Sequence, residues 1–121
     1  MKRVNEMTVE QLVELFTVIA LDQDEAILAN DNATFSRLFK KMEEVKQELK
    51  VRNGDQRRAL LRLYNHPNTH VRLKAAIATL AVAPQAARRM LEAIADSGEY
   101  SHAGDAGMTL VNLDRGIFKP T

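Results

Sequence analysis

The sequence predicts an all-α protein of six helices, and three observations support that fold class. Apolar residues recur at spacings of three and four along most of the 121 residues, which is the period of an amphipathic helix. Most of the five glycines and three prolines fall outside the periodic segments or at their first residue, where they mark helix ends. No stretch alternates apolar and polar residues over the length of a strand. We therefore expect helices over the ranges 9–29, 33–52, 55–65, 69–82, 84–97 and 102–115.

The first two segments are long enough to pair as an antiparallel hairpin. Thr8 and Gln11 form a capping-box pattern, in which each side chain satisfies a free backbone N–H of the first helical turn. The second segment ends at Asn53-Gly54, because both residue types tolerate a positive φ. Each segment carries an apolar stripe, made of Val9, Leu12, Val13, Phe16, Ile19 and Ala20 in the first and of Phe35, Leu38, Met42, Val45 and Leu49 in the second.

The third and fourth segments form a second helical pair. The third opens with Asp55 as its N-cap, and His66-Pro67-Asn68 separates it from the fourth. The fourth segment is almost entirely apolar or small, so we expect it to be enclosed on most sides. The apolar residues are Leu60, Leu61, Leu63 and Tyr64 in the third segment and Val71, Leu73, Ala75, Ala76, Ile77 and Leu80 in the fourth.

The fifth and sixth segments form a third pair, followed by a short tail. Pro84 is well placed as a first helical residue, and Gly98 ends that helix. The sixth segment begins near Ser101 and ends at Gly116. The tail, residues 117–121, contains two apolar residues and a proline, so we expect it to pack against the helices.

An internal repeat links the last four segments at an offset of 30 residues. The offset aligns Leu60 with Met90 and Leu80 with Leu110, so that both helices of one pair match both helices of the next. Helical hairpins repeated at this period are typical of an α-solenoid. The alternative is that any two amphipathic helices align somewhere. The repeat predicts a core centred on Leu61, Ala76, Ile77, Leu80, Leu91 and Leu110.

Residues 60–76 resemble a HEAT repeat. The resemblance lies in an apolar helix, a short Pro/Asn turn and then Val-Arg-x-x-Ala-Ala, residues 71–76, opening the second helix. It implies that Arg72 supports the turn, which is a structural role. The second copy departs from the pattern, since residues 103–106 contain no arginine. The resemblance implies a right-handed α-α superhelix of the HEAT/armadillo-like kind.

The chain as a whole, from about residue 8 to residue 120, resembles a bacterial domain-of-unknown-function family, number two thousand and nineteen in its series. The matching features are the opening over residues 8–16, the helix over 35–49, the block over 71–76 and the ending over 116–120. This resemblance implies a compact HEAT-like fold and brings no activity with it. The predicted domain is single, and it comprises a hairpin over 8–53, repeat one over 55–82, repeat two over 84–115 and the tail over 116–121, all within 1–121.

Composition and motifs exclude several functional classes. Hydrophobic residues make up 45% and charged residues 27%, which is ordinary for a globular protein. The chain has no cysteine, no apolar run long enough to span a bilayer and no secretory signal, so we expect a cytoplasmic protein. It also lacks a phosphate-binding P-loop, a Rossmann glycine pattern and a Gly-x-Ser-x-Gly nucleophile motif, so we expect no enzyme and no cofactor.

The histidines and a short acidic run give little sign of a metal site. His66 and His70 are four residues apart, which is a ligand spacing on a helix, but Pro67 breaks that helix. We therefore interpret them as capping or solvated loop residues and expect no metal. The acidic run Asp22, Asp24 and Glu25 lacks the spacing of a calcium loop and is interpreted as an exposed turn.

Basic residues concentrate in the middle of the chain. Residues 37–89 hold 13 Lys and Arg against four Asp and Glu, a local net charge of +9 within a chain of net charge +1. The offset of 30 residues predicts Arg58 beside Arg88, and Arg62 beside Glu92. Two interpretations stay open: a solvated charge ladder, or an anion-facing ridge. The candidate binding residues are Arg57, Arg58, Arg62, Arg88 and Arg89 on the ridge, with His70 and Lys74 on a second-helix surface.

These observations favour a non-enzymatic protein that binds another protein. Helical repeats present broad surfaces that serve mainly for contact with partners. By analogy with small bacterial proteins of this kind, we expect the chain to act as an immunity or adaptor protein. The alternative function is sequence-independent nucleic-acid binding through the basic residues. A small enzyme is a third hypothesis.

Overall fold

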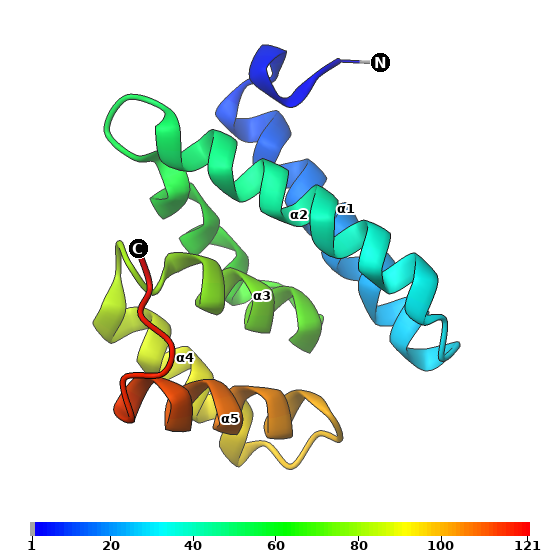
Figure 1. Cartoon of the computed structure of the whole chain (residues 1–121), viewed down its shortest axis with the longest axis vertical. Coiled ribbons are helices and arrows are strands. Elements are labelled where there is room, and N and C mark those ends of the chain that lie inside the picture. Colours follow the sequence, from blue (N-terminus) through cyan, green and yellow to red (C-terminus); the bar gives the residue numbers. More distant parts are fainter. Residues whose placement is uncertain (1) are drawn as a thin grey trace. The chain divides into compact units, whose positions relative to one another are not determined.

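A computed structural model describes residues 2–121, and its regular elements are all helices, with no strand in that range (Figure 1). The prediction of an all-α fold is confirmed. The 3-10 helices are named η and the α-helices α. They are η1 (Val4–Glu6), α1 (Val9–Leu28), α2 (Asn32–Val51), η2 (Gln56–Asn65), α3 (Thr69–Thr79), α4 (Pro84–Asp96) and α5 (His102–Asp114).

The helix expected over residues 69–82 shows the largest difference in bounds, because α3 ends at Thr79. Its last residues tighten into a turn, in which the N–H of Val82 and the N–H of Ala83 both donate to the carbonyl of Thr79. Ala83 then leaves the helical region of φ and ψ, as expected for a residue that precedes a proline. Pro84 begins α4, as predicted.

The chain divides into two compact units, Met1–Ala59 and Leu60–Thr121, and the division falls within η2. The prediction of one domain over 1–121 stays a prediction, and its first residue lies outside the described range. The two units are described separately.

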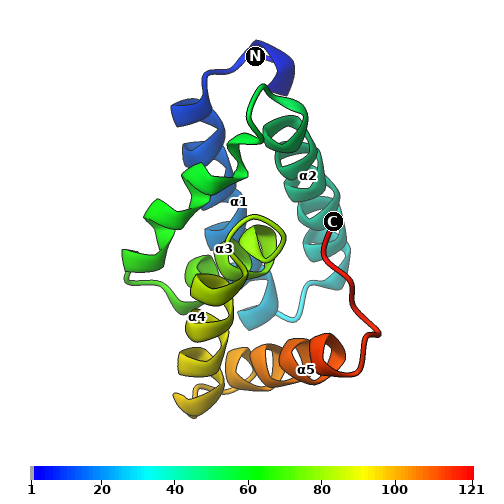
Figure 2. The same cartoon turned by 90° about the vertical axis from the view of Figure 1, so that its left-hand side faces the viewer.

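The first unit is a hairpin of two long helices with a short helix packed against it. α1 and α2 pack along each other, and η1 contacts α2 (Figures 1 and 2). The predicted capping box begins α1, since the N–H of Gln11 donates to Thr8 Oγ1 at 3.1 Å and the N–H of Thr8 donates to Gln11 Oε1 at 2.9 Å. The predicted apolar stripes meet in the interior, where the fully buried residues include Leu12, Phe16, Val45 and Leu49.

The element η2 corrects one expectation about the core. Its buried positions Arg57, Leu60 and Leu63 recur every three residues, which is the period of a 3-10 helix and not of an α-helix. Leu60 is therefore buried, whereas Leu61, predicted at the centre of the core, is only partly buried. In Figure 2, η2 is the bright green segment, which follows α2 and precedes α3 along the chain. The HEAT-like superhelix, which assumes an α-helix here, stays a prediction.

The second unit forms its core among α3, α4 and α5. α4 packs against both α3 and α5. Ala76, Leu80 and Leu91 lie in the buried cluster, as predicted, while Ile77 and Leu110 are partly buried and pack against it. Phe118 also packs there, so the expectation that the tail folds back is confirmed for this residue.

Arg72 supports the turn before α3, as the HEAT resemblance implies. Its Nη1 donates to the carbonyl oxygens of His66 at 2.7 Å and Pro67 at 3.0 Å, and its Nη2 donates to Thr69 Oγ1 at 3.0 Å. Asn68 caps the same helix by accepting from the N–H of Val71 at 3.0 Å. Arg72 is therefore a structural residue.

Within residues 2–121, no helix combines the length and the apolar composition that crossing a membrane requires.

Candidate interaction surface

Arg57, the first of the predicted ridge residues, is buried and serves a turn. Its Nε donates to Asp55 Oδ1 at 2.9 Å and its Nη2 donates to Asp55 Oδ2 at 2.7 Å. This two-pronged hydrogen bond lowers the pKa of the Asp55 carboxyl below its ordinary value and raises the pKa of Arg57. The expectation that Arg57 lies on an exposed ridge is wrong, because its side chain closes the turn that begins η2.

Arg88 is held by two carboxylates on the second unit. Its Nη2 lies 2.8 Å from Asp114 Oδ1, and its Nε lies 3.6 Å from Glu92 Oε2. Glu92 follows Arg88 by one helical turn, a spacing at which side chains on one helix meet, whereas Asp114 comes from α5, 26 residues later. These two carboxylates offset the charge that Arg88 would present to an anion.

The remaining ridge residues, Arg58, Arg62 and Arg89, are exposed. Arg89 borders a shallow hollow of about 360 Å³ on the second unit, together with Tyr64 and Met90. The Tyr64 hydroxyl lies 2.6 Å from Thr79 Oγ1, and burial raises the pKa of Tyr64. The predicted neighbours of Arg58 and Arg62 across the repeat stay predictions.

The second-helix residues differ from each other in exposure. Lys74 is half-buried, and His70 is buried, so the expectation that His70 lies on a surface is wrong. The cause is the position of His70 in the first turn of α3, where its ring lies 5.2 Å from the ring of His102 in α5. His66 has a different environment, since its Nδ1 accepts from the N–H of Asn68 at 3.0 Å. His66 therefore caps the loop, in line with the interpretation from sequence.

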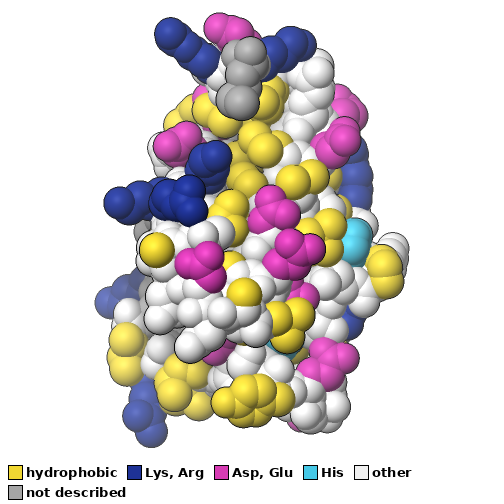
Figure 3. Space-filling view, turned by 90° about the vertical axis from the view of Figure 1, so that its right-hand side faces the viewer, with side chains coloured by type: hydrophobic (Ala, Val, Ile, Leu, Met, Phe, Trp, Pro, Cys, Tyr) yellow, Lys and Arg dark blue, Asp and Glu magenta, His cyan; other side chains and the backbone are white. Residues whose placement is uncertain are grey.

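A groove of about 820 Å³ on the first unit brings together residues that the sequence patterns did not single out as a site. It runs between η1, α1 and α2. On the face drawn in Figure 3, hydrophobic side chains lie exposed near Lys and Arg side chains at the top of the view. The lining residues are Lys2, Arg3, Val4, Asn5, Met7, Leu15, Ile19, Lys41, Glu44, Val45 and Glu48.

The floor of this N-terminal groove is apolar. Ile19 and Val45 are buried beneath it, while Val4, Met7 and Leu15 are partly buried and form its walls. Apolar surface that stays accessible in a groove costs free energy in water, and covering it with an apolar partner recovers that free energy. The groove can therefore bind an apolar or amphipathic ligand.

The rim of the groove is charged, and its positively charged side chains outnumber the negatively charged ones. Lys2, Arg3 and Lys41 are exposed, as is Glu44. The other acid, Glu48, accepts a hydrogen bond from Arg52 Nε at 2.8 Å, so its charge is already compensated. The rim consequently presents more positive than negative charge to a ligand.

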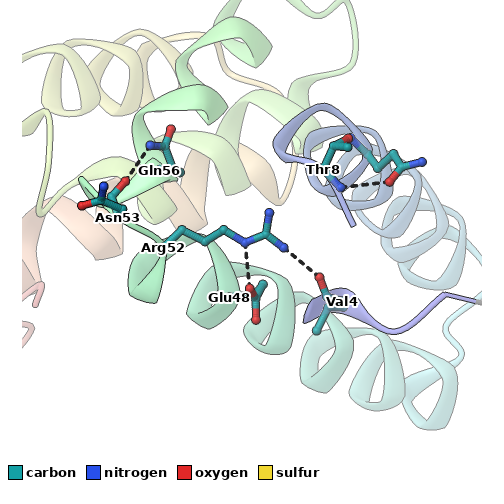
Figure 4. Close-up of polar contacts among 7 residues, drawn as sticks. Val4, Thr8, Glu48, Arg52, Asn53 and Gln56 are labelled. Carbon is teal, nitrogen blue, oxygen red and sulfur yellow. Dashed lines mark hydrogen bonds and ion pairs between the residues drawn. The ribbon is translucent and has the colours of Figure 1, made fainter. Parts of the chain in front are cut away.

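Arg52 also holds η1 in place over α2. While Nε donates to Glu48, Nη2 donates to the carbonyl oxygen of Val4 at 3.1 Å (Figure 4). One planar guanidinium thus joins the last turn of α2 to the 3-10 helix that forms a wall of the groove. Arg52 is therefore a positioning residue for the groove. In the sequence it is one of the 13 basic residues over 37–89.

Sequence reasoning missed the groove because η1 has only three residues. A helix of one turn produces no periodicity that a pattern search can detect. One signal was present: Met7 directly precedes the N-cap Thr8, and an apolar residue at that position commonly packs against the helix that follows.

Comparisons with known proteins give a family and a similar structure. The family profile described as "Domain of unknown function (DUF2019)" matches residues 10–114. The crystal structure of the protein RPA1889 from Rhodopseudomonas palustris CGA009 is 51% identical, with 100% of each chain covered and a TM-score of 0.95. The search of curated proteins returned no match.

Proposed function

The chain belongs to the DUF2019 family, and we propose that it functions by binding another protein in the N-terminal groove, without catalysing a reaction. The observation that carries this proposal is the apolar floor bordered by charged side chains of α2 and of the two residues that precede η1. Interfaces between proteins commonly combine an apolar centre with a polar rim. Such a site selects a partner by shape and by charge.

The proposal draws further support from how the groove is built. Arg52 donates one hydrogen bond to the Val4 carbonyl of η1 and another to Glu48 of α2, so the wall of the groove is in place before a partner arrives. A site ordered beforehand loses less conformational entropy on binding, which increases affinity. The absence of recognisable catalytic motifs from the sequence agrees with a function in binding alone.

In this proposal the binding takes place in the cytoplasm, and the chain itself acts as an immunity or adaptor protein. Sequence-independent nucleic-acid binding is the less favoured alternative. Arg57 and Arg88, two of its five candidate residues, already bind carboxylates. The apolar floor of the groove also does not suit a nucleic acid, because sequence-independent nucleic-acid binding depends mainly on contacts with phosphates.

Site-specific photocrosslinking in bacterial cells tests this function. A benzophenone amino acid replaces Asn5, which lines the groove, or Ser36, an exposed residue of α2 outside the groove, as the matched control. We expect a crosslinked species from position 5 that protease removes and nuclease leaves intact, with none from position 36. Adducts of equal yield at both positions, no adduct, or an adduct removed by nuclease would contradict the proposal.

A further inference from the structure

We infer that the N-terminal groove accepts an acidic amphipathic helix of the partner protein, with about two of its turns lying along α2. This inference rests on the proposed function and adds the chemistry of the partner. It is carried by the length of the groove, the charge of its rim and the backbone hydrogen bonding of its walls.

The length of the groove matches two helical turns. On α2 its lining runs from Lys41 through Val45 to Glu48, a stretch of eight residues whose seven steps rise about 10 Å along the helix axis. On α1 the lining residues are Leu15 and Ile19, one turn apart. Two turns of a partner helix would present anchors at positions i, i+3 or i+4, and i+7, the arrangement by which helices bind grooves.

The charge of the rim selects an acidic partner. Lys2 and Arg3 directly precede η1, and Lys41 lies on α2, so cations from two separate segments border the apolar floor. Glu44 is the acid that opposes them, since Glu48 is paired with Arg52. Acidic side chains flanking the apolar face of a bound helix would meet these cations, and complementary potentials of this kind favour one partner over others.

The walls of the groove favour a helix over an extended segment. η1, α1 and α2 form these walls, and their backbone groups bond largely within their own elements. An extended peptide that binds by strand addition needs a strand edge to pair with, and no strand occurs within residues 2–121. A helix satisfies its own backbone groups and can present side chains alone.

Three synthetic helical peptides test the inference against the full chain by fluorescence anisotropy at low salt. The first has leucines at positions i, i+3, i+4 and i+7 with glutamates on both flanks of that face. The second replaces every glutamate by lysine, and the third keeps the composition of the first but scatters the leucines around the helix. We expect the first peptide to bind at least about tenfold more tightly than either of the others.

A pair of charge reversals on α2 locates the binding. Lys41→Glu changes a residue that lines the groove, and Lys40→Glu changes its exposed neighbour, which does not. Both positions are exposed, so both variants should keep the helical circular dichroism of the parent chain. We expect Lys41→Glu to weaken binding of the first peptide about tenfold and Lys40→Glu to weaken it less than about twofold.

The inference is overturned if no peptide binds, if the acidic and basic peptides bind equally, or if the two variants lose affinity equally. Binding of the scattered peptide as tightly as the first, or more tightly, would overturn it as well, because charge without an apolar face would then suffice. None of these results depends on the crosslinking experiment at position 5. A protein adduct there, together with failure of the acidic peptide, would leave the proposed function standing and remove only this partner chemistry.

Discussion

Arginine side chains of this chain hold turns and helix ends together. Arg57 closes the turn at Asp55, Arg72 binds the loop carbonyls before α3, and Arg52 joins α2 to η1. The guanidinium group offers five donors in a plane, which suits it to such joints. A sequence shows that an arginine is present but does not show whether it faces solvent. Arg57 was for this reason expected on an exposed ridge.

The Asp55–Arg57 pair makes the free energy of unfolding depend on pH. The folded state lowers the pKa of Asp55, so the pair stabilises the fold fully above the unfolded-state pKa of about 3.9, and this contribution is lost as the pH falls through the lower folded-state pKa. We expect Asp55→Asn to reduce the free energy of unfolding by about 1–2 kcal/mol at pH 7. This deficit should shrink below about pH 4. Urea unfolding followed by circular dichroism across pH 3–7 measures both effects.

Asp96→Asn serves as the control, since it changes an exposed carboxylate on α4. It should change the free energy of unfolding by less than about 0.5 kcal/mol. A deficit for Asp55→Asn that is absent at pH 7, or one that grows in acid, would contradict the role given to this pair.

At the level of elements, hydrophobic periodicity predicted the six longer helices but not every detail within them. Thr8 and Pro84 marked helix starts correctly, because caps and first-turn prolines act locally. η1 was missed because it is a single turn. η2 was expected to be an α-helix because ten residues are too few to separate a period of 3.0 from one of 3.6.

The 3-10 period of η2 predicts which of two adjacent leucines supports the fold. Leu60→Ala should cost about 2–5 kcal/mol, since Leu60 is fully buried, and Leu61→Ala should cost distinctly less. Chemical denaturation of the two variants measures both costs. Equal costs would contradict the 3-10 register, and a reversed order would favour the α-helical register with Leu61 at the centre of the core.

The joint made by Arg52 predicts how η1 behaves when the joint is removed. Arg52→Ala should speed hydrogen exchange of the amides of Glu6 and Met7, whose N–H groups bond to Arg3 and Val4, with little change in the middle of α2. Hydrogen–deuterium exchange with mass spectrometry measures this. Arg37→Ala is the control, because Arg37 is an exposed arginine of the same helix whose Nη2 donates to Thr34. Equal exchange in both variants would contradict a positioning role for Arg52.

At the scale of the whole molecule, the sequence predicted the fold class and the family better than the site. The net charge of +9 over residues 37–89 left two interpretations open, a solvated charge ladder or an anion-facing ridge, and it did not show that Arg57 binds Asp55 or that Arg88 binds Asp114. The groove combines Lys2 and Arg3 with residues of α2 about 40 positions later, and such a juxtaposition follows only from how η1, α1 and α2 pack. Separate sequence patterns do not contain it.

The central claim is that this groove binds an acidic amphipathic helix, and amide chemical-shift mapping by NMR tests it most directly. The isotopically labelled full chain is titrated with the acidic peptide described above. We predict that the largest shift changes fall in residues 2–7, 15–19 and 41–48, the three stretches that line the groove. Shift changes concentrated in residues 60–121, or spread evenly over the chain, would contradict the claim.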